Sequence, residues 1–167
     1  LELEKLQDKL PAFQLYSVND ILRKELGEES FSKISNISQP IAAASIAQVH
    51  FADIQNGSST RHVAIKILRP NIEKVFNEEL DALMLLAYII QSIVKKTKRL
   101  KLIEIVQFLR EITNVEMDLR YEAAAANEFY ENTKNDLEFK VPKIYWNYTS
   151  KKNTLPKQSK WYFNTRS

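Results

Sequence analysis

The stretch QPIAAASIAQVHFADIQNGSSTRHVAIKILRP, residues 39–70, decides the fold expected of this 167-residue chain. It contains two segments rich in β-branched and small residues, 45–54 and 62–69, on either side of QNGSST. The Asn-Gly pair in that connection is a strong turn signal between two strands. The pattern therefore predicts a β-hairpin whose loop is slightly longer than the minimal one.

The second strand carries Lys66 in the middle of an apolar run. Because alternate residues of a strand share a face, Lys66 is expected beside Ala64 and Leu68. The opposite face is formed by Val63, Ile65 and Ile67. Two interpretations fit these residues: an edge-strand lysine whose stem covers apolar surface, or the nucleotide lysine of a kinase-like lobe, with the small Ala64 leaving room for adenine.

Composition indicates a single globular domain, with 44% hydrophobic and 27% charged residues. Cysteine is absent, which excludes disulfides, thiolate metal sites and cysteine nucleophiles. The net charge of +3 comes from residues 151–167, which hold five basic residues and no acidic one, whereas the first 150 residues hold 19 basic and 21 acidic residues. No basic face is expected on the body of the domain, so nucleic acid is not expected as a partner.

Helices are predicted on both sides of the hairpin. Ser17 as N-cap and Gly27 as stop predict a helix over 17–27, and apolar spacing predicts long helices over 71–94 and 102–130. The apolar stretch 80–94 is shorter than the roughly 18 to 20 residues of a spanning helix, so a buried helix is expected there. The aromatic segment VPKIYWN predicts a further strand, and His50 and His62 are expected as strand residues rather than metal ligands.

Three motifs, PIAAASIAQVH, VAIKILRP and EMDLRYEAAAANEF, occur in this order and together resemble the UbiB family of atypical kinase-like proteins, which is associated with ubiquinone biosynthesis. The resemblance covers roughly residues 5–149. The order of helix, hairpin, two long helices and strand predicts an α+β fold with a small antiparallel sheet. The resemblance implies that this fold is a protein-kinase-like N-lobe with long family-specific helices. It also implies ATP and Mg as the cofactors of the family.

The resemblance assigns roles to individual residues. The alanine-rich loop that replaces a kinase glycine-rich loop is formed by Ala42, Ala43, Ala44 and Ser45. Lys66 and Ala64 match the nucleotide site, and Pro142 fits the strand after the motif helix. Glu116 and Asp118 match the family's Glu-x-Asp motif, whose glutamate is expected to pair with Lys66. No metal site is assigned in this chain.

Alternatives remain open at two of these places. On an unbroken helix Glu116 and Asp118 lie about 200° apart, so only one of them can face Lys66. Glu116 could instead form an i to i+4 pair with Arg120. The alanine loop could be a small-residue segment packed beneath a helix.

Two parts of the family pattern are missing from this sequence. The opening Lys-x-Gly-Gln motif should precede the chain, and after NYTSKKNTL the catalytic Asp, the Asn and the DFG motif of a C-lobe do not appear. We therefore expect an N-lobe fragment over 1–154, incomplete at both ends and inactive alone, with 155–167 as a basic tail that makes few contacts. A truncated, frame-disrupted or split gene would each give such a sequence.

Two other functions also fit the sequence. One is half of a split kinase or ATPase, completed by a separate C-lobe chain, and the other is a helical module that binds lipid or a partner protein. Whether the chain is an enzyme is left open. We expect a cytoplasmic location without a transmembrane segment, with membrane association as an alternative.

Overall fold

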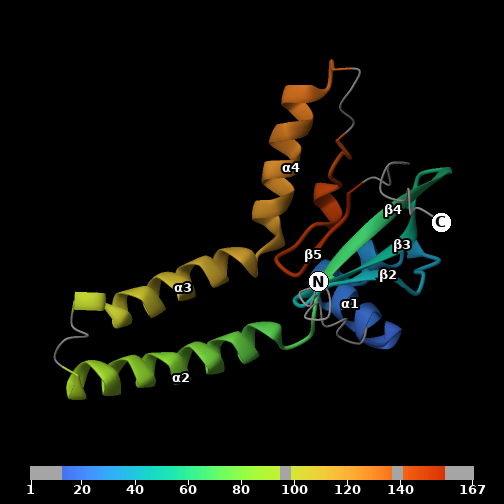
Figure 1. Ribbon diagram of the computed structural model, residues 1–167. Helices are drawn as coiled ribbons and strands as arrows, with labels where there is room; N and C mark the ends of the chain where they lie inside the picture. Colours follow the sequence, from blue (N-terminus) through green and yellow to red (C-terminus); the bar gives the residue numbers. More distant parts are fainter. Residues whose placement is uncertain (1–12, 95–98, 137–140, 157–167) are drawn as a thin grey trace, which may run out of the picture. The chain divides into compact units, whose positions relative to one another are not determined.

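The computed structural model describes residues 13–94, 99–136 and 141–156, and the chain divides into two compact units. The second unit is Asn71–Met117, and the first consists of the residues before and after it. Along the chain the elements are α1 (Leu15–Phe31), β1 (Ile34–Ser35), β2 (Pro40–Ala43), β3 (Ala47–Asn56), β4 (Ser59–Leu68), α2 (Ile72–Ile93), α3 (Leu102–Glu116), α4 (Leu119–Thr133), the 3-10 helix η3 (Trp146–Tyr148) and β5 (Asn153–Thr154) (Figure 1). The α+β class expected from the sequence is confirmed.

The predicted hairpin is β3 and β4, but its loop is minimal. The strands pair in register from Ala47 opposite Leu68 to Asn56 opposite Ser59, which leaves two loop residues. The first of them, Gly57, has φ +62°, as a type II′ turn requires. The expected longer loop is wrong because glycine accepts this backbone conformation and lets the strands pair right up to the turn.

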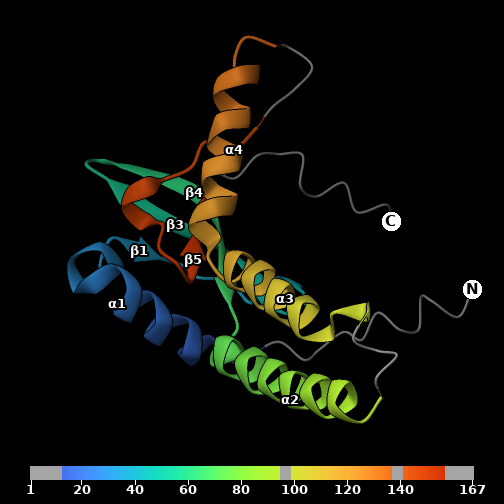
Figure 2. The ribbon, with the colours of Figure 1, turned by 90° about the vertical axis from the view of Figure 1, so that its left-hand side faces the viewer.

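The sheet is antiparallel, in the order β1-β3-β4-β5, and β2 also pairs with β3. The predicted apolar face of β4 packs on α1, and the shared core contains fully buried Val18 and Leu22 from α1 with Val63, Ile65 and Ile67. Figure 2 shows α1 lying along the sheet. Helix α1 begins at Leu15 rather than Ser17, and Gly27, with φ +77°, interrupts it where a stop was expected.

The last part of the first unit differs from the sequence expectation. No strand forms over VPKIYWN: Ile144 makes a single bridge with Pro156, and η3 follows. The strand that pairs with β4 is β5, which begins six residues after the end of VPKIYWN. Leu155 is fully buried and the Pro156 carbonyl accepts a hydrogen bond from Ala64 N at 3.2 Å, so these two residues belong to the body and not to a tail. Residues 157–167 of the expected tail lie outside the described residues.

The predicted single helix over 102–130 is two helices. α3 ends at Glu116, and Asp118 is an extended N-cap of α4, with φ −121° and ψ 96°. The Asp118 side chain accepts from Arg120 N, and Leu119 N donates to the Lys151 carbonyl at 2.9 Å. The helix therefore breaks at Asp118 because of this cap and of the hydrogen bond to Lys151, although the sequence has no Gly or Pro there.

The second unit is an antiparallel hairpin of α2 and α3. Its small core contains Leu80, Ala87 and Val106, and Arg110 Nη2 lies 2.7 Å from Asp81 Oδ1. The expectation that stretch 80–94 is buried is wrong, since most of its large apolar side chains are exposed. None of the helices in the described parts of the chain is long and apolar enough to cross a bilayer.

Candidate functional site

Lys66 forms an ion pair with a glutamate of α4. Its Nζ lies 2.5 Å from Glu122 Oε2, and the two side chains are 31% and 53% exposed. On the sheet, Lys66 pairs with Val49 of β3 on one side and Thr154 of β5 on the other. The edge-strand interpretation is thereby excluded, because β4 has a neighbour on both sides at this residue.

Packing of α1 decides which way Lys66 points. Because alternate residues of β4 share a face and α1 covers the face of Val63 and Ile65, Lys66 and Ala64 are left on the other face. Ala64 is partly exposed and lies two residues before the lysine. The lysine face therefore combines a positive charge with a small neighbour, as the sequence predicted.

The alanine-rich segment is only partly a loop: Ala42 and Ala43 are the last residues of β2, and Ala44 and Ser45 begin the turn to β3. Ala42 is opposite Val49, which is opposite Lys66, so the three form one row across the sheet on the same face. Two strand spacings separate the ends of this row, roughly 10 Å. All four residues of the alanine-rich segment are exposed, namely Ala42, Ala43, Ala44 and Ser45. Packing of this segment beneath a helix is therefore wrong.

Arg69, the residue after β4, holds the turn in shape, and its backbone N donates to the Ile46 carbonyl at 2.8 Å. Arg69 Nε donates to the Ala44 carbonyl at 3.1 Å. Within the loop, Ala44 N donates to the Ala47 carbonyl at 2.8 Å. The β2–β3 turn is thus tied to the end of the strand that carries Lys66.

The Glu-x-Asp pair is divided between the two units. Glu116 is the exposed last residue of α3, in the second unit, and its pairing with Lys66 stays a prediction. Asp118 accepts from Arg120 N at 3.1 Å and forms an ion pair with the Arg120 guanidinium at 2.6 Å. These hydrogen bonds from Arg120 hold the pKa of the Asp118 carboxyl below its usual range. Arg120 therefore pairs with Asp118, not with Glu116 as the alternative had it.

Glu122 is the functional residue that sequence reasoning missed. It lies in the first turn of α4, inside the motif EAAAANEF that follows the Glu-x-Asp pair. In protein kinases the strand lysine pairs with a glutamate inside a helix. That rule would have favoured Glu122 once the helix was divided at Asp118, but the resemblance to the family's Glu-x-Asp motif led to Glu116.

Thr154 is a second residue that the sequence did not single out. It lies beside Lys66 in the β4–β5 pairing and is 3% exposed. Within the described parts of the chain its Oγ1 is buried without a hydrogen-bond partner. An unpartnered hydroxyl next to the lysine is able to bind a polar ligand atom.

The fit to ATP is therefore partial. Lys66, the Thr154 hydroxyl and the exposed alanine loop fit a phosphate-bearing ligand. A magnesium site does not fit, because no group of three His, Asp or Glu side chains placed to hold a metal occurs among residues 13–94, 99–136 and 141–156.

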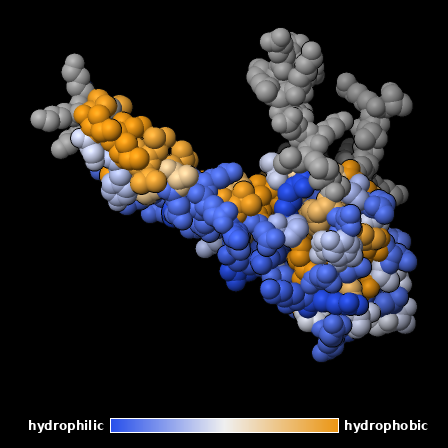
Figure 3. Space-filling view, turned by 90° about the horizontal axis from the view of Figure 1, so that it is seen from below, coloured by the Kyte–Doolittle hydropathy of each residue, from blue (hydrophilic) through white to orange (hydrophobic). Residues whose placement is uncertain are grey.

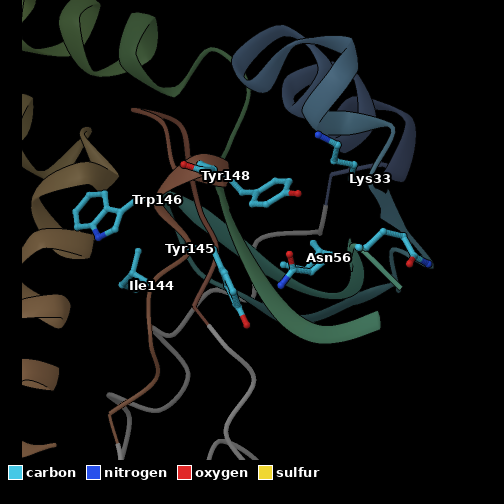
Figure 4. A pocket seen from close by; sticks show the side chains of 10 residues that line it. Lys33, Asn56, Ile144, Tyr145, Trp146 and Tyr148 are labelled. Atoms are coloured by element: carbon cyan, nitrogen blue, oxygen red, sulfur yellow. The ribbon is translucent and has the colours of Figure 1, made fainter. Parts of the chain in front are cut away.

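A hollow of about 520 Å³ lies at the turn end of the β3–β4 hairpin, away from Lys66 (Figure 4). Its lining residues are Lys33, Ile54, Gln55, Asn56, Gly57, Ile144, Tyr145, Trp146, Asn147 and Tyr148. Ile54 also belongs to the core beneath α1. The hollow thus opens beside the core face of the sheet and is not the lysine site.

Both histidines are strand residues, as expected. His50 is fully buried on β3, and its Nδ1 donates to the Ser38 carbonyl at 2.8 Å, since a carbonyl can only accept. Its Nε2 then accepts from Gln48 Nε2, also at 2.8 Å. Burial lowers the pKa of the His50 imidazole, so the neutral form is the native one. His62 bonds to Asp53 on the neighbouring strand.

An antiparallel sheet with a Val-Ala-Ile-Lys strand, whose lysine pairs with a helix glutamate, defines the N-lobe of protein-kinase-like proteins. The family comparison agrees: the model of the ABC1 atypical kinase-like domain matches residues 5–155. The chain belongs to this family, in its UbiB branch.

Relatives in three bacteria share the name "Probable protein kinase UbiB". The chain is 37% identical over 152 residues to the one from Marinobacter nauticus and 35% identical over 150 residues to the one from Cellvibrio japonicus, covering 89% of this chain in each case. It is 32% identical over 150 residues, 88% of this chain, to the one from Azotobacter vinelandii. The chain spans 27% of the length of each of these relatives.

Proposed function

We propose that this chain is the nucleotide-facing N-lobe of a UbiB-type atypical kinase or ATPase that supports ubiquinone biosynthesis. The observation that carries the proposal is the ion pair of Lys66 with Glu122 at 2.5 Å. A lysine–glutamate pair of this kind holds the ammonium where it meets the phosphates of ATP. The link to ubiquinone comes from the family resemblance alone.

In this proposal each residue has a limited task. Lys66 supplies one positive charge to the phosphates, and Glu122 orients the ammonium. Ala64 leaves room beside the strand for the base. The methyl groups of Ala42 to Ala44 restrict the backbone and stand where a glycine-rich loop would let phosphates approach, so phosphate binding by backbone amides is expected to be weak.

Phosphoryl transfer also needs carboxylates that hold magnesium and position the acceptor, and in kinases these belong to the C-lobe. The sequence contains no DFG motif. We therefore propose that the lobe acts only with a C-lobe, whether in one longer polypeptide or as a separate chain. By itself it is expected to bind Mg-ATP no tighter than millimolar, about −4 kcal/mol, and not to hydrolyse it.

Calorimetric titration of the 167-residue chain with Mg-ATP tests the weak-binding part of the proposal. Micromolar binding that disappears in Lys66→Ala would contradict it and would favour a lobe that is functional before its C-lobe is added.

A chimera tests the functional part. Residues 5–155 replace the matching segment of the Marinobacter nauticus relative, and ATP hydrolysis by the purified chimera is compared with that of the parent. We expect activity in the chimera and a loss of at least about 100-fold in Lys66→Ala, the scale for removing one charge-stabilising group. Lys74→Ala, an exposed lysine of α2, is the matched control and should leave activity unchanged. An active Lys66→Ala chimera would refute the role of the lysine.

A further inference from the structure

The hollow at the turn end of the β3–β4 hairpin has the composition of a ligand site. Figure 3 shows apolar residues gathered over one end of the α2–α3 hairpin, whereas the lining of the hollow combines aromatic rings, side-chain amides and one lysine. Its volume of about 520 Å³ lies within the range of about 300–1,000 Å³ that is usual for small-molecule sites. The proposed function does not use this hollow, and Lys66 is not among its lining residues.

Hydrogen bonds hold the walls of the hollow in place. Gln55 N, at the hairpin end, donates to the Lys33 carbonyl at 2.8 Å. Around η3, Tyr148 N donates to the Tyr145 carbonyl at 3.0 Å, and the fully buried Asn153 donates its Nδ2 to the Tyr148 carbonyl at 2.7 Å. All of these residues belong to the first compact unit. The hollow is therefore preformed, so a ligand would have to order little additional chain.

Two tyrosine rings line the hollow. Tyr145 and Tyr148 are partly buried and pack against the core beneath α1. Figure 4 shows both rings beside Asn56 and Lys33. Lys33 interacts electrostatically with the Tyr148 hydroxyl, which places this ring next to the lysine. A ring that rests on a core and borders a hollow is a rigid platform on which a flat ligand ring can stack.

Three side-chain amides lie beside these rings. Gln55, Asn56 and Asn147 line the hollow and are exposed. Each amide offers an acceptor oxygen and two N–H donors. Nucleobases present the same mixture of donors and acceptors along their edges, and asparagine and glutamine bind such edges through two hydrogen bonds. The amides therefore fit a heteroaromatic ring better than a plain hydrocarbon ring.

Charge indicates what such a ring would carry. Lys33 is the charged residue in the described lining of the hollow, which contains no acidic side chain. Its Nζ lies 2.9 Å from Glu29 Oε1, but the two side chains are 45% and 89% exposed, so solvent screens this pair. The ammonium is therefore free to turn to an anionic ligand group. A single lysine matches one phosphate group better than the several charges of a triphosphate.

We propose that this hollow binds a nucleoside monophosphate. The base stacks on Tyr148, its edge bonds to the amides, and its phosphate meets the Lys33 ammonium. A nucleic acid is a poorer ligand, because the first 150 residues hold 19 basic against 21 acidic residues and a polyanion requires an extended basic face. A free mononucleotide needs only the one cation that the hollow provides.

Titration of the isotope-labelled 167-residue chain with AMP, followed through amide chemical shifts, locates the ligand. We expect shifts in residues 54–57 and 144–148 and at Lys33, and none in residues 42–45 or at Lys66. Adenosine and inorganic phosphate are titrated separately. Each should bind at least about tenfold more weakly than AMP, because each makes only part of the contacts. The Lys66→Ala variant should bind AMP as the unchanged chain does, so the result is independent of the proposed function.

Substitutions test the three contacts one by one. Tyr148→Leu should weaken AMP binding about 10- to 100-fold through loss of the stacking ring, Lys33→Met about tenfold, and Asn56→Ala about fivefold. Tyr16→Leu, an exposed tyrosine of α1, and Lys74→Met, an exposed lysine of α2, are the matched controls and should leave the affinity unchanged. Because Tyr148 also packs on the core, the two exposed positions provide the test if Tyr148→Leu does not fold.

Three outcomes would overturn the inference. These are no AMP-dependent shifts in residues 54–57 and 144–148, shifts confined to residues 42–45 and Lys66, and an affinity for AMP no greater than that for adenosine or for inorganic phosphate alone. The last would show that the hollow does not recognise a base and a phosphate together.

Discussion

Replacing Glu122 tests which glutamate supports Lys66. We consider a double-mutant cycle in the 167-residue chain, with Lys66→Met, Glu122→Gln and the two combined. The coupling free energy is the part of the combined effect that the single changes do not explain. A second cycle with Glu116→Gln is the matched control, because Glu116 is the partner that the family resemblance favoured.

The structure sets the expected size of this coupling. The pair is close, at 2.5 Å, but its side chains are 31% and 53% exposed, so solvent screens the attraction. Exposed pairs of this kind contribute about 0.2–1 kcal/mol. We expect a coupling near 0.5 kcal/mol for Lys66 with Glu122, and less than about 0.2 kcal/mol for Lys66 with Glu116. At 1 M salt the screening length falls to about 3 Å, so the coupling should shrink.

Urea unfolding followed by circular dichroism gives the free energy of unfolding of each variant. A larger coupling with Glu116 than with Glu122 would show that the observed ion pair is not the one that matters. A coupling with Glu122 that does not depend on salt would show that it is not electrostatic. Either result would show that the Lys66–Glu122 ion pair does not support the proposed function.

Three further predictions concern stability. Leu155→Ala should lower the free energy of unfolding by about 2–4 kcal/mol, because it empties a fully buried core position. Exposed Lys151→Ala should change the free energy of unfolding by less than about 0.5 kcal/mol in the same urea titration. Equal effects of the two substitutions would show that Leu155 is not part of the core. Asp118→Ala should lower the free energy of unfolding by about 1–2 kcal/mol, because α4 loses its N-cap. Circular dichroism should show a lower helix content. An unchanged thermal midpoint would show that the cap does not stabilise the chain. In the unfolded chain His50 is protonated below its ordinary pKa of 6.5, whereas the buried imidazole stays neutral, so the unfolded state binds more protons and the stability should fall as the pH drops from 7 to 5.5. His50→Gln should flatten this part of the plot of thermal midpoint against pH. If the slope is unchanged in His50→Gln, another group causes the pH dependence.

The hairpin and the lysine could be predicted because local patterns determine them. Alternation in Val-Ala-Ile-Lys fixes the face of each residue, and Gly57 fixes the turn. The position of Lys66 opposite Glu122 could not be predicted in the same way. It depends on a helix break at Asp118. The Asp118 cap and the hydrogen bond between Leu119 and Lys151, which are 32 residues apart in the chain, together produce this break.

The C-terminal strand shows the same limit. The aromatic residues of VPKIYWN have strand propensity, but Trp146–Tyr148 forms a 3-10 helix and β4 pairs with the polar Asn153 and Thr154 instead. Strand propensity describes how well a side chain fits a half-buried surface, and the partner strand decides whether that surface exists. The resemblance to a family supplied the order of the motifs, but not the residue that completes the ion pair.

The α2–α3 hairpin interrupts the first unit at two points that adjoin each other. Leu68 N donates to the Lys152 carbonyl and Leu119 N donates to the Lys151 carbonyl, both at 2.9 Å, so the chain leaves and re-enters this unit beside the same two residues. Such closely spaced ends are those of a modular insertion, which a short glycine-rich bridge could replace. A shortened chain lacking 71–117 would keep Lys66 and Glu122 on the same scaffold. The hairpin could in turn be inserted into a loop of another small β-sheet protein.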